Sequence, residues 1–151
     1  VLKSLNLPKP DVSYSFYDIA SFPDGGPLVL ASSQGLMLVN PHWGERVMIQ
    51  HFGKESGLPT AFVNKVRTTE EGNVWMLLYE HGLAYFDLRT QRIYTWSTRE
   101  GLISQFLSDL TVMGDEVWVK AHDDRVARYK ITDLLKNHAK IQKNTTRNAG
   151  S

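Results

Sequence analysis

The feature of this sequence that most restricts its fold is a unit that ends by starting a copy of itself. Residues 57–102 open with a Gly-Leu pair and close with another, 44 positions later. Trp118 falls 43 positions after Trp75, and the Gly-Leu pair at 35–36 precedes the one at 82–83 by 47 positions. The sequence therefore predicts about three imperfect repeats, and a repeat has to be recognised before any other feature is interpreted.

Each repeat is predicted to consist of short strands separated by Gly-, Asn- and Asp-containing turns. Residues 74–79 (VWMLLY) have no polar side, which is typical of a strand buried on both faces between two other sheets. A period of about 40 to 50 residues built from short strands indicates propeller blades. The predicted fold is all-β, with about three four-stranded antiparallel blades of a partial β-propeller. The predicted strands are 12–20, 28–31, 36–39, 46–52, 62–67, 74–79, 83–88, 92–96, 106–112, 116–121 and 125–131.

The third repeat lacks a fourth strand, and a helix is predicted in its place. Residues 132–143 carry Leu134, Leu135, His138, Ala139 and Gln142 at helical spacing. Thr132 or Asp133 is the predicted N-cap. The resulting division is a lead-in segment at 1–11, repeats at 12–56, 57–100 and 101–143, and a flexible tail at 144–151.

The central repeat resembles the two-component regulator propeller repeat, whose pattern is close to G-L-P-x-N-x-V-x-x-I-x-x-D-x-x-G-N-L-W-I-G-T-x-x-G-L-x-x-F-D. The resemblance extends over residues 12–131 and weakens in the outer copies, where Leu28 replaces the Trp of the first and Arg125 replaces a glycine of the third. In the central copy, Ala61, Thr69 and Leu77-Leu78 depart from the pattern. The matching residues are Gly57, Leu58, Pro59, Val63, Val66, Gly72, Asn73, Val74, Trp75, Gly82, Leu83, Phe86 and Asp87.

Composition narrows the class of protein. Of the 151 residues, 42% are hydrophobic and 22% charged, as in folded soluble domains. A net charge of +1 favours neither nucleic acid nor an anionic membrane surface, and no apolar run is long enough to span a bilayer. The absence of cysteine excludes disulfides and thiolate metal sites. The chain begins at Val1, and we expect it to be a segment of a longer protein.

The sequence contains no local catalytic motif, and no metal or cofactor is predicted. Its five histidines are far apart, and the acid pairs at 70–71 and 123–124 are more simply solvated turns. In a blade, the turns between the second and third strands share one face with the connections between blades. On that face the candidate ligand-binding residues are Ser33, Gln34, Tyr79, His81, His122, Asp123 and Arg125, with Thr60 and Gln105 from the connections.

Four residues are predicted to pack blade against blade, because aromatic and large apolar side chains bury the most area. They are Trp75, Trp118, Leu83 and Phe86. Trp96 is expected to pack at the rim of its blade, whereas for Trp43 both a packing role and a ligand contact are left open.

The resemblance implies a non-catalytic sensor: a ligand-recognition segment in the periplasmic part of a membrane-anchored bacterial signalling protein. The implied ligand is a small molecule or an oligosaccharide, with no nucleic acid and no membrane contact within the segment. The alternative is a scaffold whose open sheet faces bind other blades of the parent protein or a second copy of the chain. An enzyme is the least supported class, since no carboxylate or histidine recurs at a site-like position of the repeats.

Overall fold

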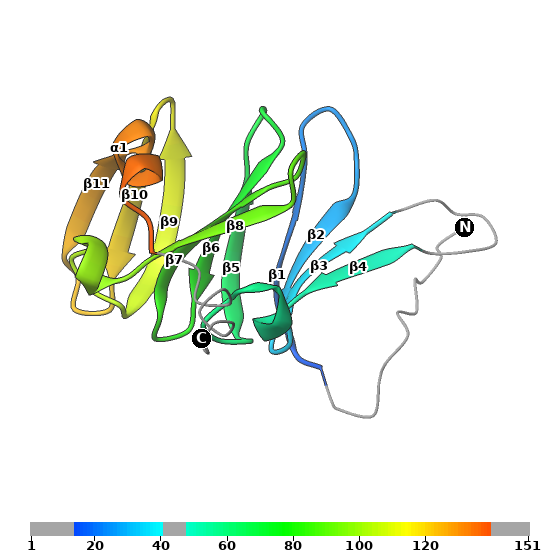
Figure 1. Cartoon of the computed structure of the whole chain (residues 1–151), viewed down its shortest axis with the longest axis horizontal. Coiled ribbons are helices and arrows are strands. Elements are labelled where there is room, and N and C mark those ends of the chain that lie inside the picture. The colour runs from blue at the N-terminus through cyan, green and yellow to red at the C-terminus, as the bar shows by residue number, and fades with distance from the viewer. Residues whose placement is uncertain (1–13, 41–47, 140–151) are drawn as a thin grey trace, which may run out of the picture.

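Three antiparallel sheets and one short helix make up the structure, a computed structural model that describes residues 14–40 and 48–139 (Figure 1). The first sheet contains β1 (Phe16–Ser21), β2 (Leu28–Ser32), β3 (Gly35–Val39) and β4 (Ile49–Phe52). The second contains β5 (Val63–Thr68), β6 (Asn73–Leu78), β7 (Gly82–Asp87) and β8 (Arg92–Trp96). The third contains β9 (Leu107–Met113), β10 (Glu116–Ala121) and β11 (Val126–Lys130), followed by α1 (Ile131–Lys136). The all-β class is therefore confirmed.

Within each sheet the strands pair in the order in which they occur in the chain. The first strands of the three sheets lie next to one another, because β1 contacts β5 and β5 contacts β9. The three sheets thus lie side by side across the molecule, the first in blue and cyan, the second in green and the third in yellow and orange (Figure 1).

The second sheet is buried on both of its faces. In β6, Val74 and Met76 pack in a core shared with the first sheet, whereas Trp75 and Leu77 pack in a core shared with the third. All four side chains are fully buried. This confirms the prediction that residues 74–79 form a strand between two other sheets, with Tyr79 the exception because it lies in the turn.

Predicted strand boundaries agree with the structure to within one or two residues where both ends are described, and 92–96 and 116–121 match at both ends. One repeat equivalence is wrong. Leu36 of the first sheet pairs with Ala31, as Leu83 of the second pairs with Leu77, so the counterpart of Trp75 is Val29 and not Leu28. The reason is that the turn after β2 is one residue shorter than the turn after β6.

Trp75 and Trp118 occupy equivalent positions but different environments. Trp75 is buried between the second and third sheets, 5.6 Å from Trp96 between ring centres. Trp118 is half-buried on the other face of the third sheet, where Arg128 lies 5.6 Å above its ring. Leu83 and Phe86 are fully buried, Leu83 against the third sheet and Phe86 against the first.

The predicted helix over 132–143 is much shorter than expected. It begins at Ile131 and ends at Lys136, and neither Thr132 nor Asp133 caps it. The Leu134 carbonyl accepts a hydrogen bond from the Trp96 indole at 2.8 Å, and the Ala139 amide donates to the Thr95 carbonyl. These contacts draw the chain along β8, so the helix stops. The lead-in segment, the tail, Trp43 and residues 140–143 lie outside the described residues.

A glycine begins the third strand of the first two sheets because the fourth strand passes close to it. Gly35 and Gly82 both have positive φ, and a Cβ on either would lie 2.3 Å from a backbone oxygen of the fourth strand, that of Phe52 or Trp96. The equivalent residue of the third sheet is Arg125. Among the described residues that sheet has no fourth strand, which explains why a side chain is tolerated there.

Gly82→Ala tests this close approach, with Gly72→Ala as the matched control. Both glycines have φ near +90°, but no heavy atom lies within 4 Å of a Cβ on Gly72. Left-handed backbone alone costs an alanine about 1–2 kcal/mol. In urea unfolding, Gly72→Ala should lower the free energy of unfolding by about that amount, and Gly82→Ala should lower it by at least about twice as much. Equal losses would contradict the proposed contact with Trp96.

Substituting the two equivalent tryptophans tests how far each sheet face is buried. Trp75→Ala should lower the free energy of unfolding by about 3–5 kcal/mol, the usual loss for a large buried aromatic side chain. Trp118→Ala should cost less than half as much, since one side of its ring faces solvent or Arg128. Chemical denaturation followed by circular dichroism measures both, and a larger loss for Trp118→Ala would refute the difference in burial.

Alkaline titration of Tyr85 tests the core between the second and third sheets, where this side chain packs with Trp75 and is 8% exposed. Burial, followed by repulsion from Asp87, raises the pKa of Tyr85 to about 12. The unfolded pKa is about 10. Because the neutral phenol is favoured in the folded state, its contribution to stability is complete below pH 10 and is lost as pH rises toward 12. Tyr85→Phe should flatten this loss in denaturation curves collected between pH 9 and 12.

Candidate functional site

The turns that join the second and third strands lie at one end of all three sheets, the lower end in Figure 1. In each sheet, the amide of the first residue of this turn donates a hydrogen bond to the carbonyl of the residue just before the first strand. These bonds are Ser33 to Ser15 at 2.8 Å, Tyr79 to Phe62 at 3.0 Å and His122 to Phe106 at 2.9 Å. We call this surface, made of residues 33–34, 79–81 and 122–125 with Ser15, Phe62 and Phe106, the turn end.

A connection between sheets also belongs to the turn end, as the sequence predicted. The Gln105 carbonyl accepts from the Gly82 amide at 3.1 Å, and its side-chain amide donates to the Glu80 carbonyl at 3.4 Å. The Gln105 side-chain oxygen accepts from Thr98 at 3.1 Å. Gln105 therefore fixes the second turn against the chain that leads into the third sheet.

The two candidate residues of the first turn are engaged in local contacts. Ser33 is buried, and its hydroxyl accepts a hydrogen bond from the Ser15 amide at 3.0 Å. The Gln34 carbonyl accepts from the His51 ring, whose other nitrogen lies 3.3 Å from the Glu55 carboxylate. The structure thus places Ser33 inside the fold, unlike the solvent-facing position predicted for it.

The candidate residues of the second and third turns are exposed. The His81 ring donates to the Tyr79 carbonyl at 2.9 Å. His122 lies in the corresponding turn of the third sheet, at the same end. The Arg125 guanidinium is 2.9 Å from the Asp123 carboxylate. The hydrogen bond from Arg125 lowers the pKa of Asp123, so this pair is an ionised, solvent-facing contact. Such groups can bind polar ligands by hydrogen bonding.

Exposed aromatic rings, which fall within the strands predicted from the sequence, lie beside these polar residues. Phe62 is 43% exposed and packs 5.8 Å from the ring of Tyr79, while Phe106 is 49% exposed. In the first sheet, Phe16 packs against Tyr14 at 5.8 Å. The available signal was the alignment of Phe106 with Phe62 immediately before the buried Val63 and Leu107. Apolar rings next to polar turn groups make a surface suited to recognition.

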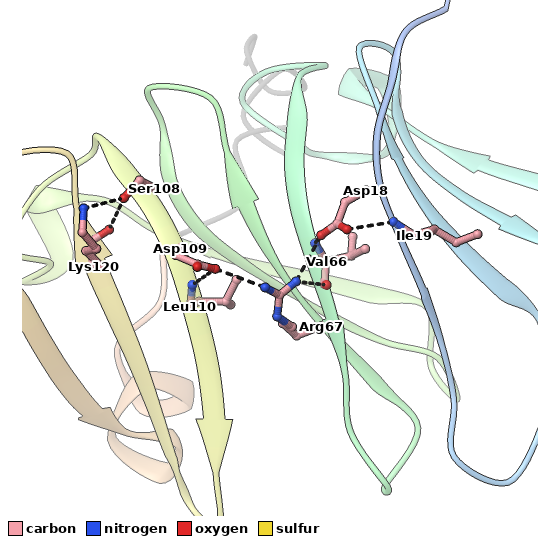
Figure 2. Close-up of polar contacts among 8 residues, drawn as sticks. All are labelled: Asp18, Ile19, Val66, Arg67, Ser108, Asp109, Leu110 and Lys120. Atoms are coloured by element: carbon pink, nitrogen blue, oxygen red, sulfur yellow. Dashed lines mark hydrogen bonds and ion pairs between the residues drawn. The ribbon is translucent and has the colours of Figure 1, made fainter.

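A second polar cluster, also missed from the sequence, lies on the first strands. Arg67 of β5 contacts Asp18 of β1 and Asp109 of β9, each at 3.1 Å (Figure 2). On the third sheet, Lys120 donates to the Ser108 hydroxyl at 3.2 Å and lies 3.0 Å from Asp124. The sequence alone does not indicate the contacts of Arg67 with Asp18 and Asp109, because partners in different sheets leave no local spacing pattern.

Within residues 14–40 and 48–139, no group of three His, Cys, Asp or Glu side chains is placed to hold a metal ion. In the same part of the chain, no helix has the length and apolarity needed to cross a membrane.

Comparison with solved structures places this fold beside bacterial extracellular domains. The extracellular domain of the putative one component system BT4673 from B. thetaiotaomicron is 25% identical, with a TM-score of 0.63 over 76% of this chain and 17% of that one. That of the putative hybrid two component system BT3049 from the same organism is 16% identical, with a TM-score of 0.62 over 87% and 19%. This chain therefore spans less than a fifth of either domain.

More distant likenesses show the fold alone. KlHsv2 with loop 6CD replaced by a Gly-Ser linker is 15% identical, with a TM-score of 0.51 over 85% of this chain and 39% of that one. Neither a protein-family model nor a curated protein matches the sequence. Membership of the propeller repeat family therefore remains a prediction from the residues quoted above.

Proposed function

We propose that this chain is a non-catalytic recognition segment in the extracytoplasmic part of a bacterial signal-transduction protein. The observation that carries the proposal is the likeness to the BT4673 extracellular domain, at 25% identity over 76% of this chain. The repeat pattern of the sequence supports the same class of protein.

The three sheets are then part of a larger β-propeller. Side-by-side first strands and face-to-face packing support this arrangement. This chain spans 17% and 19% of the two bacterial extracellular domains, which supports a parent protein with further sheets.

Recognition is proposed to take place at the turn end. The strands carry buried apolar residues, whereas the turn end presents exposed rings, such as Phe62 and Tyr79, together with polar groups that differ between repeats, such as His81 and His122. Fixed strands with variable turns are the usual division between scaffold and binding surface. A polar ligand with flat apolar faces, such as an oligosaccharide, fits this combination.

A panel of oligosaccharides tests the proposal by thermal denaturation and NMR titration. A ligand of this class should raise the melting temperature, because binding to the folded state alone stabilises it. Shift changes should concentrate on the turn end. Phe62→Ala should weaken binding by about tenfold or more, the loss of about 1.4 kcal/mol of contact. Met113→Ala, which removes an apolar side chain that is 60% exposed, against 43% for Phe62, from another surface, should leave binding unchanged.

Two results would contradict ligand recognition at this end. Saturable binding that is unaffected by Phe62→Ala and His122→Ala would place the ligand elsewhere. Absence of binding across the panel, together with stable self-association in light scattering, would favour the second candidate function described next.

The second candidate is a docking scaffold, favoured by the outer face of the third sheet. Pairing registers place Trp118 between Thr111 of β9 and Arg128 of β11 on this face. Met113 and Val126 are each 60% exposed, and a groove of about 410 Å³ runs past them and Trp118. Another sheet of the parent protein, or a second copy, would bury these residues as the third sheet buries Trp75.

A further inference from the structure

Arg67 is bonded to both neighbouring sheets at once. One guanidinium nitrogen lies 3.1 Å from Asp18 of the first sheet, and the other lies 3.1 Å from Asp109 of the third (Figure 2). The nitrogen that faces Asp18 also donates to the carbonyl of Val66 at 2.9 Å. The head group is thus fixed at three points, one from each sheet.

Both carboxylates are held in place by backbone groups. Asp18 accepts from the Ile19 amide at 2.9 Å and from the Val66 amide of the second sheet at 3.1 Å. Asp109 accepts from the Leu110 amide at 2.9 Å. A carboxylate that is already oriented loses little freedom when the guanidinium binds it.

The two aspartates occupy the same structural position in their sheets. Each lies just after a break in register of the first strand, at Phe16/Asp18 in the first sheet and opposite Lys120/Ala121 in the third. Lys65 takes this position in the second sheet. The repeat therefore presents an acid, a base and an acid along adjacent strands, and Arg67, two residues beyond Lys65, bridges the acids.

We infer that Arg67 couples the first sheet to the third, so that a shift of Asp18 alters the contact at Asp109 and the reverse. The planar guanidinium links the two contacts rigidly, because its two nitrogens cannot move independently. A lysine at this position has a single charged nitrogen and cannot hold both carboxylates in this geometry. The coupling belongs to the three sheets themselves and stands whether or not a ligand binds the turn end.

The alternative is that the two ion pairs act separately. Arg67, Asp18 and Asp109 side chains are 37%, 23% and 53% exposed, and ion pairs this accessible to water each contribute little. Independent pairs would give effects confined to the sheet that is changed. Communication between the sheets, rather than total stability, is therefore the quantity to measure.

Three backbone amides report on the cluster in hydrogen exchange measured by NMR. Those of Ile19 and Val66 report on Asp18, and that of Leu110 reports on Asp109. In Asp109→Asn, exchange at Ile19 and Val66 should rise by about threefold or more, the size expected for residues in one bonded network. In Asp18→Asn, exchange at Leu110 should rise similarly. In Arg67→Lys, neither aspartate substitution should produce the distant effect.

Asp124→Asn is the matched control, because it removes a carboxylate of the third sheet that contacts Lys120 and not Arg67. It should leave the Ile19 and Val66 amides unchanged. The inference is overturned if Asp109→Asn has no effect on those two amides, or if Asp124→Asn has an equal one. A distant effect that persists in Arg67→Lys, or a uniform rise that includes core amides such as that of Phe86, would overturn it as well.

Discussion

Burial of the second sheet on both faces is the interaction on which the rest of the structure depends. Successive side chains of a strand point to opposite faces, so β6 and β7 serve two cores at once. Val74 and Phe86 pack toward the first sheet, while Trp75 and Leu83 pack toward the third. Without this sheet, neither the first nor the third would have its described core. An apolar strand with no polar side is therefore the structural centre of the chain.

Among residues 14–40 and 48–139 the third sheet has three strands, and this accounts for two departures from the repeat. The short helix α1 places Leu134 in the core shared with the second sheet, next to Trp96, and its carbonyl accepts the indole hydrogen bond at 2.8 Å. Because no fourth-strand carbonyl crowds the start of β11 among the described residues, Arg125 can stand where the other sheets need glycine. A local change in the backbone thus permits a change in residue type.

The division of labour between strands and turns agrees with the proposed recognition role. Apolar strands stack the sheets, and backbone bonds between the turns and the chain before the first strands present exposed rings and polar groups together. Arg67 lies apart from that surface, on the strands that all three sheets bring side by side.

Several elements of the fold could be predicted from residues alone. The strands at 92–96 and 116–121 and the double burial of residues 74–79 follow from local pattern, because alternation and turn chemistry act over a few residues. The end of the predicted helix could not, since it depends on Trp96 and Thr95, which lie far from it in the sequence. The same limit explains why Val29, rather than Leu28, is the counterpart of Trp75, as a turn shorter by one residue shifts the alignment.

For the candidate site, the sequence located the turns and most of their polar residues. It did not indicate that Ser33 is buried, or that Phe62 and Phe106 face solvent, because a residue at a strand end has no fixed face. The bridge from Asp18 through Arg67 to Asp109 also depended on tertiary structure. The sequence determined the repeat and its apolar strands through short-range periodicity. Only the packing of three sheets decided which side chains meet, since those contacts join residues more than 40 positions apart.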